Sequence, residues 1–176
     1  VLKYSNTLLN FENIEHIWKA LVTTGQDGES NLFFIWLLDI LNAEKLTPND
    51  GDVHSRIFND LLKTQLETSN ITSECFQVVK TLFIHLNLGS NLRLNSERTD
   101  YVVCGDELVG IDYIWKIAFD SKRQDVSTSA ITLIKMVYHN YGEEMRASVN
   151  KKYEECIATV MQTFVDNTKK LFHIMD

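Results

Sequence analysis

The chain has 176 residues, of which 44% are apolar, and this is enough to bury a cooperative core, so we expect one folded block. Its formal net charge is −7 and its lysines and arginines occur in scattered pairs, which disfavours a nucleic-acid partner, because phosphate binding needs clustered cations. The longest apolar run, Leu32 to Leu41, falls well short of the roughly 20 residues that cross a bilayer, so we expect no membrane partner either.

The first part of the chain predicts a pair of helices over about 10–44. One proline and seven glycines in the whole chain favour long helices over the many turns of a β-sandwich. Apolar residues keep helical spacing from Phe11 to Val22, and a second helix follows from about Ser30 and stops before Pro48. The second helix is apolar nearly all round, which is typical of a helix sandwiched between neighbours.

The remainder predicts two further pairs and a final helix. Apolar spacing indicates a second pair over about 50–87 and a third over about 106–141. The segment 90–105 between them is polar and aperiodic, so we expect an inserted loop that folding does not require. A final amphipathic helix is predicted over about 147–168.

One phrase of the sequence recurs at a distance of 97 residues. Ile14, Ile17, Trp18 and Lys19 recur as Ile111, Ile114, Trp115 and Lys116. Beyond this phrase, Ser30, Phe34, Leu37 and Ile40 align with Ser127, Ile131, Ile134 and Val137. With one helix pair between the copies, the unit is about 48 residues, close to armadillo and HEAT repeats. The predicted fold class is all-α, with stacked antiparallel helix pairs in an armadillo/HEAT-like α-solenoid segment. The twin tryptophans Trp18 and Trp115 should then be equally buried.

The third pair resembles a known family. The residues that carry the resemblance are Gly110-Ile111-Asp112-Tyr113-Ile114-Trp115, then Ala130-Ile131, Leu133, Tyr138 and Gly142. This segment looks like the long armadillo/HEAT-like arm of the very large ubiquitin-specific proteases of the fat-facets type, relatives of the X-linked deubiquitinase. The resemblance implies a parent enzyme that hydrolyses isopeptide bonds to ubiquitin with a Cys-His-Asp/Asn thiol protease site elsewhere in its sequence.

That catalytic site is not expected in this chain. The family places a Thr-Cys nucleophile after an Asn-x-Gly motif, whereas the nearest imitation, Asn87-Leu88-Gly89, is followed by no cysteine. The family's histidine lies beside glycine and aromatic residues, whereas His139 lies at the end of an apolar helix. We therefore expect no catalytic residues here.

The three cysteines, Cys75, Cys104 and Cys156, lie far apart, which favours reduced thiols in the cytosol. Cys156 shares an apolar helix face, which favours an inert buried thiol. Cys104 is close to Asp106 and Glu107, and neighbouring carboxylates raise the pKa of a thiol. A small thiol hydrolase built on one of the three cysteines stays open as an alternative, and native iodoacetamide labelling would detect its activated thiol.

Metal and cofactor sites are not expected. The five histidines form no HxxxH or HxH pair, so a metal site would need a spatial coincidence. The acid pairs Glu143-Glu144 and Glu154-Glu155 are adjacent on predicted helices, where neighbouring side chains diverge into solvent.

Three asparagines, Asn42, Asn87 and Asn140, each end the second helix of a predicted pair. In armadillo proteins an asparagine on the groove-lining helix can grip a peptide backbone, because its amide both donates and accepts hydrogen bonds. Asparagine also ends helices by adopting the left-handed conformation, which the position at the last turn favours. They are the candidate partner-binding residues, with capping as the other interpretation.

The sequence as a whole predicts a non-catalytic scaffold or protein-recognition arm of a large deubiquitinating enzyme. We expect an intracellular, cytoplasmic location, and protein partners that offer peptide or helical segments, among them ubiquitinated substrates or adaptors of the parent. An armadillo/HEAT scaffold or adaptor unrelated to deubiquitination would use the same helices and stays open as the alternative.

Overall fold

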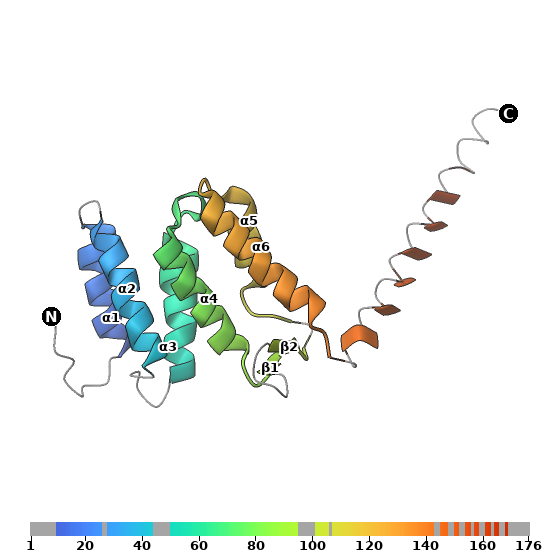
Figure 1. The fold of residues 1–176 in the computed structure, drawn as a ribbon, viewed down its shortest axis with the longest axis horizontal. Helices are drawn as coiled ribbons and strands as arrows, with labels where there is room; N and C mark the ends of the chain where they lie inside the picture. Colours follow the sequence, from blue (N-terminus) through green and yellow to red (C-terminus); the bar gives the residue numbers. More distant parts are fainter. Residues whose placement is uncertain are drawn as a thin grey trace.

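The computed structural model is built mainly of helices, with one short β-hairpin (Figure 1). It describes residues 10–25, 28–43, 50–94, 101–105 and 107–142 and, with gaps, residues 145–168. The prediction of a mainly helical chain is confirmed.

Three helix pairs follow one another along the described chain. The first pair is α1 (Phe11–Trp18), continued by the π-helical η1 (Lys19–Thr23), and α2 (Glu29–Asn42). The second is α3 (Asp50–Arg56), continued by the π-helical η2 (Ile57–Lys63), and α4 (Ser73–Asn87), with the short 3-10 turn η3 (Thr68–Asn70) between them. The third is α5 (Ile111–Asp120) and α6 (Gln124–His139). Figure 1 shows the three pairs side by side.

Local side chains fix where several helices begin. The Asn10 side chain accepts a hydrogen bond from the Asn13 amide (3.0 Å) at the start of α1, and Thr72 accepts one from the Cys75 amide (3.3 Å) at the start of α4. Gly110, before α5, has a φ of 84°, and a Cβ added there would lie 2.5 Å from the Phe58 ring. Only glycine therefore allows the start of α5 to pack this closely on the second pair.

The first helices of the pairs are joined through the second pair. The indole N–H of Trp18 donates to Gln65 Oε1 (2.9 Å), just after η2. From the other side, the Tyr113 hydroxyl donates to the Leu62 backbone carbonyl (3.0 Å). The end of η2 is thus tied both to the first pair and to the third.

The second helices also contact one another in order, since α2 packs against α4 and α4 against α6. The Thr72 hydroxyl donates to Asn31 Oδ1 of α2 (2.9 Å), and the neighbouring Ser73 hydroxyl donates to Asp125 Oδ2 of α6. Two consecutive residues at the start of α4 therefore connect the three second helices at the same end.

One continuous apolar core runs through all three pairs. Its largest fully buried side chains include Trp18, Phe33, Phe58, Phe76 and Phe83. Trp18 meets Phe33 edge to face, with ring centroids 5.4 Å apart, so the first helix pair is closed by aromatic contacts.

The segment 90–105, expected as an inserted loop, contains a β-hairpin. Strand β1 (Leu92–Leu94) pairs antiparallel with β2 (Tyr101–Val103). Leu92 and Val103 face each other and are 0% and 1% exposed, so both belong to the core. The Val103 amide donates to the Asn140 carbonyl (2.8 Å), which ties the hairpin to the end of α6. Three-residue strands are too short to give a periodic pattern, and for this reason the sequence indicated a loop.

The expectation of equal burial for the twin tryptophans is wrong. Trp18 is 1% exposed and Trp115 is 37% exposed. In α5 the buried residues are Tyr113, Ile114, Ile117 and Ala118, so the position of Trp115, which aligns with the buried Trp18, is not among them. The repeated phrase therefore recurs in sequence, but α5 turns a different face to its neighbours because it packs on η2 through Tyr113.

Part of the predicted final helix, 147–168, lies outside the described residues, including Tyr153, Cys156 and Val160. The positions that are described from 150 to 168 are helical, and Phe164 is 71% exposed. Nowhere in the described residues does a helix combine the length and the apolar character needed to cross a membrane.

We predict that the two tryptophans differ in their contribution to stability. Trp18→Ala should lower the free energy of unfolding by roughly 3–5 kcal/mol, because it empties a buried site. Trp115→Ala should cost about 1 kcal/mol, because its side chain is partly in solvent already. Urea unfolding followed by far-UV circular dichroism measures both, and equal losses would contradict the observed burial.

The hairpin should contribute to folding through its buried residues. Leu92→Ala should lower the free energy of unfolding by roughly 2–5 kcal/mol, as large-to-small core substitutions do. Leu94 of the same strand is 46% exposed, so Leu94→Ala is the matched control and should cost about 0.5 kcal/mol or less. If Leu92→Ala is as stable to unfolding as Leu94→Ala, the segment 90–105 does not contribute to the core and is not required for folding.

Candidate functional site

The three candidate asparagines lie in different surroundings. Asn42 is exposed at the end of α2, where Ala43 forms the cap. Asn140 forms the cap of α6 with φ −107° and ψ 52°, which is not the left-handed conformation. Its carbonyl accepts from the Val103 amide, so its backbone holds the hairpin.

Asn87 is fully buried and acts as a clamp between α4 and the segment before α5. Its side-chain amide donates to the carbonyls of Phe83 (2.8 Å) and Val109 (3.0 Å). Its side-chain oxygen accepts from the Val109 amide (2.8 Å) and from Asn91 (3.3 Å). The sequence suggested that this amide binds the backbone of a partner or caps the helix. In the structure it binds the backbone of this chain, and the Asn87 side chain is buried.

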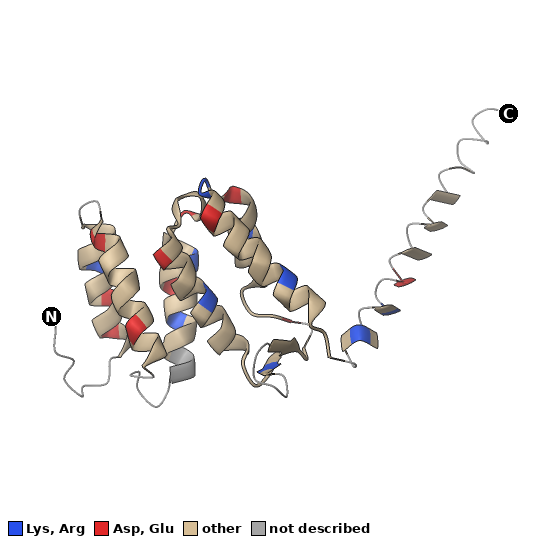
Figure 2. Cartoon of the chain, viewed as in Figure 1, with Lys and Arg blue, Asp and Glu red and all other residues tan. Residues whose placement is uncertain are grey.

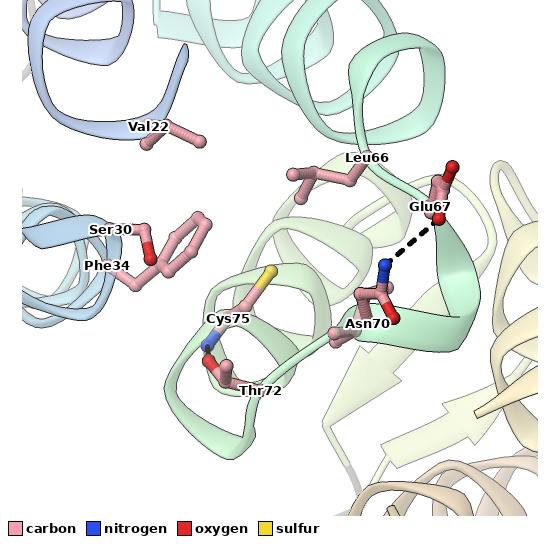
Figure 3. Close-up of a pocket in the computed structure, with 9 residues that line it drawn as sticks. Val22, Ser30, Phe34, Leu66, Glu67, Asn70, Thr72 and Cys75 are labelled. Carbon is pink, nitrogen blue, oxygen red and sulfur yellow. Dashed lines mark hydrogen bonds between the residues drawn. The ribbon is translucent and has the colours of Figure 1, made fainter. Parts of the chain in front are cut away.

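A cleft of about 240 Å³ lies between the first two helix pairs (Figure 3). Val22 of η1 and Phe34 of α2 line one side, and Leu66 and Ile71 of the second pair contribute to the other. Ser30, Glu67, Asn70 and Thr72 add polar groups, and Asn70 donates to Glu67 Oε2 (2.9 Å). The cleft thus combines an apolar lining with polar groups that can donate and accept hydrogen bonds.

A second cleft, of about 200 Å³, lies between α4 and α6. Phe76, Leu133 and Met136 form its apolar part. Gln77, Lys80, Thr128, Ser129 and Thr132 form its polar part. The two clefts occupy successive junctions, one between the first and second pairs and one between the second and third. Both combine residues from elements far apart in sequence and follow no motif, so sequence reasoning missed them.

The two described cysteines, Cys75 and Cys104, lie in different surroundings. Cys75 lines the first cleft but is 1% exposed, and burial, followed by the charge of Glu74, raises the pKa of its thiol far above its ordinary value. The Cys104 thiol lies 3.7 Å from the Val102 carbonyl, to which it donates. Cys156 lies outside the described residues.

Titratable groups elsewhere form small, separate contacts. His54 Nε2 and His85 Nδ1 are 3.4 Å apart inside the second pair. Among the described residues, no group of three or more His, Cys, Asp and Glu side chains is arranged to hold a metal ion. Hydrogen bonds from Arg123 and Ser73 lower the pKa of Asp125 well below its usual range.

Figure 2 shows lysines and arginines interspersed with aspartates and glutamates along the described helices. One ion pair connects the second helix pair to the third: Lys63 Nζ of η2 lies 2.7 Å from Asp112 Oδ2 of α5. This hydrogen bond lowers the pKa of Asp112.

The chain is similar in sequence to one region of very large ubiquitin hydrolases. It is 31% identical over 159 residues to Ubiquitin carboxyl-terminal hydrolase 24 of Mus musculus, and 30% identical over 159 residues to the Homo sapiens protein of that name. It is 25% identical over 161 residues to Ubiquitin carboxyl-terminal hydrolase 9Y of Mus musculus. The matches cover 86% of this chain, or 89% for the last, but the chain spans only 6% of the length of these relatives. No protein-family model matches the chain. The similarity to large ubiquitin-specific proteases thus extends beyond the third pair to most of the chain.

The buried amide of Asn87 should be essential to the junction before α5. Asn87→Ala leaves the Val109 amide and carbonyl without their partner and should lower the free energy of unfolding by about 1–3 kcal/mol. Asn42→Ala is the matched control at an exposed helix end and should change it by about 0.5 kcal/mol or less. Urea unfolding of both variants measures the difference, and an Asn87→Ala variant as stable as the control would show that the clamp contributes nothing.

Proposed function

We propose that this chain is a non-catalytic segment of the helical arm of a large deubiquitinating enzyme, and that the arm holds protein partners for a catalytic domain elsewhere in the parent. The observation that carries the proposal is the 31% identity over 159 residues to a part of Ubiquitin carboxyl-terminal hydrolase 24 that makes up 6% of that protein. A segment of this size within so long an enzyme suits one unit of an extended scaffold.

An armadillo/HEAT-like solenoid is the architecture that we propose for the arm. Its support is the order of contacts, in which α4 touches α2 and α6, and the residues at the end of η2 bond to both Trp18 and Tyr113. In a solenoid each unit contacts its neighbours alone and the surface grows with the number of units.

The clefts at the two junctions are the recognition surface that we propose. Each offers apolar side chains beside hydroxyl, amide or charged groups, as needed to hold an apolar side chain and the polar backbone next to it. Extended or helical protein segments fit such a surface, and the net charge of −7 disfavours nucleic acid. Ubiquitinated substrates or adaptors of the parent are the proposed partners, in the cytoplasm.

The proposed absence of catalysis rests on the thiols. Isopeptide cleavage needs a thiolate, a base within hydrogen-bond reach and a third group that orients the base. The buried Cys75 has a raised thiol pKa, which is the opposite of activation.

The chain by itself should release no fluorophore from a ubiquitin C-terminal amide and form no adduct with a thiol-reactive ubiquitin probe. In the full parent enzyme, Thr132→Trp should fill the cleft between α4 and α6. Cleavage of a ubiquitinated protein substrate should then slow, while hydrolysis of the ubiquitin amide stays unchanged. Fluorescence and gel assays measure the two reactions.

Lys135→Trp is the matched control for the cleft, because Lys135 is exposed on the same helix and does not line the cleft. It should leave both reactions unchanged. Adduct formation by the isolated chain that is lost in a Cys75→Ser, Cys104→Ser or Cys156→Ser variant would overturn the non-catalytic assignment. If Thr132→Trp and Lys135→Trp change the cleavage of the ubiquitinated protein equally, the cleft between α4 and α6 does not take part in substrate recognition.

A further inference from the structure

The third helix pair exposes a group of apolar side chains, which we term the aromatic face: Trp115, Phe119, Ile131 and Tyr138. Their exposed fractions are 37%, 79%, 40% and 44%. The Trp115 and Phe119 rings stack with centroids 5.6 Å apart, and Trp115 lies 6.2 Å from Tyr138. Side chains from α5 and α6 therefore form one surface. Contiguous apolar side chains in solvent mark a place where another element binds.

The aromatic face lies on the flank of α6 that is turned away from the second pair. On the flank facing α4, Ser129, Thr132 and Met136 line the cleft between the two helices. At about 100° per residue, Ile131 and Tyr138 project from the opposite flank of the helix. Helix α2 packs on α4, and α4 packs on α6. A helix that followed α6 in the chain and packed on the aromatic face would continue this order.

Residues 150–168 carry a matching apolar stripe. The described positions there are helical, and Ile157, Met161, Phe164 and Val165 are 51%, 62%, 71% and 41% exposed. Intervals of four, three and one residues place all four on one side of a helix. An isolated helix of this length is marginally stable in water, so burying the stripe would stabilise it.

The chain leaves α6 beside the aromatic face. Tyr141 forms a bridge with Val103, and its ring lies 6.0 Å from Tyr138. Tyr141 therefore lies at the edge of the face. The described positions from 150 to 168 project away from the three pairs in Figure 1, so docking brings back a segment whose tether corresponds to an effective concentration on the order of millimolar.

We propose that the aromatic face is the docking surface for the apolar stripe of residues 150–168 of the same chain. The occupant follows from three observations: the face continues the order in which α2, α4 and α6 pack, the stripe has the same apolar chemistry, and the chain path starts at the edge of the face. This inference goes beyond the proposed function and does not depend on any role in deubiquitination.

Limited trypsin digestion of the full chain tests the docking, with the rate of cleavage after Lys151 as the readout. Phe119→Asp on the face and Phe164→Asp on the stripe should each raise this rate at least tenfold, because docking is what keeps the helix folded. The double variant should be cleaved no faster than the faster single variant, since both changes break the same contact. Both side chains are more than two thirds exposed, so the core stays intact, which the circular dichroism melt of each variant checks.

Two matched controls accompany the test: Lys116→Asp, exposed on α5, and Gln162→Asp, exposed beside the stripe. Neither should change the cleavage rate. Light scattering should show a monomer for the native chain and for every variant. Cleavage rates that are equal in the test and control variants would overturn the proposal. A native dimer that Phe119→Asp dissociates would also overturn it, because the face would then belong to a second copy.

Discussion

The contact of α4 with α2 on one side and with α6 on the other is the interaction on which the rest of the structure depends. At its start, Thr72 and Ser73 bond to the two neighbouring helices. At its end, Asn87 holds the backbone of Val109 and so positions the chain for α5. Both clefts include residues of α4, and this helix therefore determines the architecture and the candidate binding surface together.

The helices were predictable because their signal is local, whereas what each helix buries depends on its neighbours. The helical spacing of apolar residues near Phe11 and Leu82 favours a helix on the evidence of neighbouring residues alone. The exposure of Trp115 could not be read from its phrase, because α5 is oriented by the contact of Tyr113 with Leu62. In the hairpin, Leu92 pairs with Val103, and Val103 also bonds to the end of α6. No periodic pattern in the sequence indicates that these contacts bury the two side chains.

The sequence offered Asn42, Asn87 and Asn140 as partner-binding candidates, and no sequence motif pointed to the clefts. An asparagine at the end of a second helix does grip a peptide backbone, but for Asn87 the backbone is the chain's own. The clefts combine residues as distant as Val22 and Cys75, so their existence depends on the stacking of the pairs. The thiol of Cys75 was open to a catalytic interpretation in the sequence, and its burial in the core removes the activation that catalysis needs.

A stack of helix pairs presents an outer face at each open side, and the chemistry of that face decides whether another unit can be added. Polar outer faces suit a terminal unit, which must stay in contact with water. The outer face of the third pair carries Trp115, Phe119 and Tyr138 instead, so it is apolar where the terminal unit of a solenoid would be polar. If residues 150–168 cover it, a further junction forms on the far side of α6. A cleft lies at the junction of the first and second pairs and another at the junction of the second and third. Burial of apolar side chains at a further junction would therefore extend the core and the candidate recognition surface together.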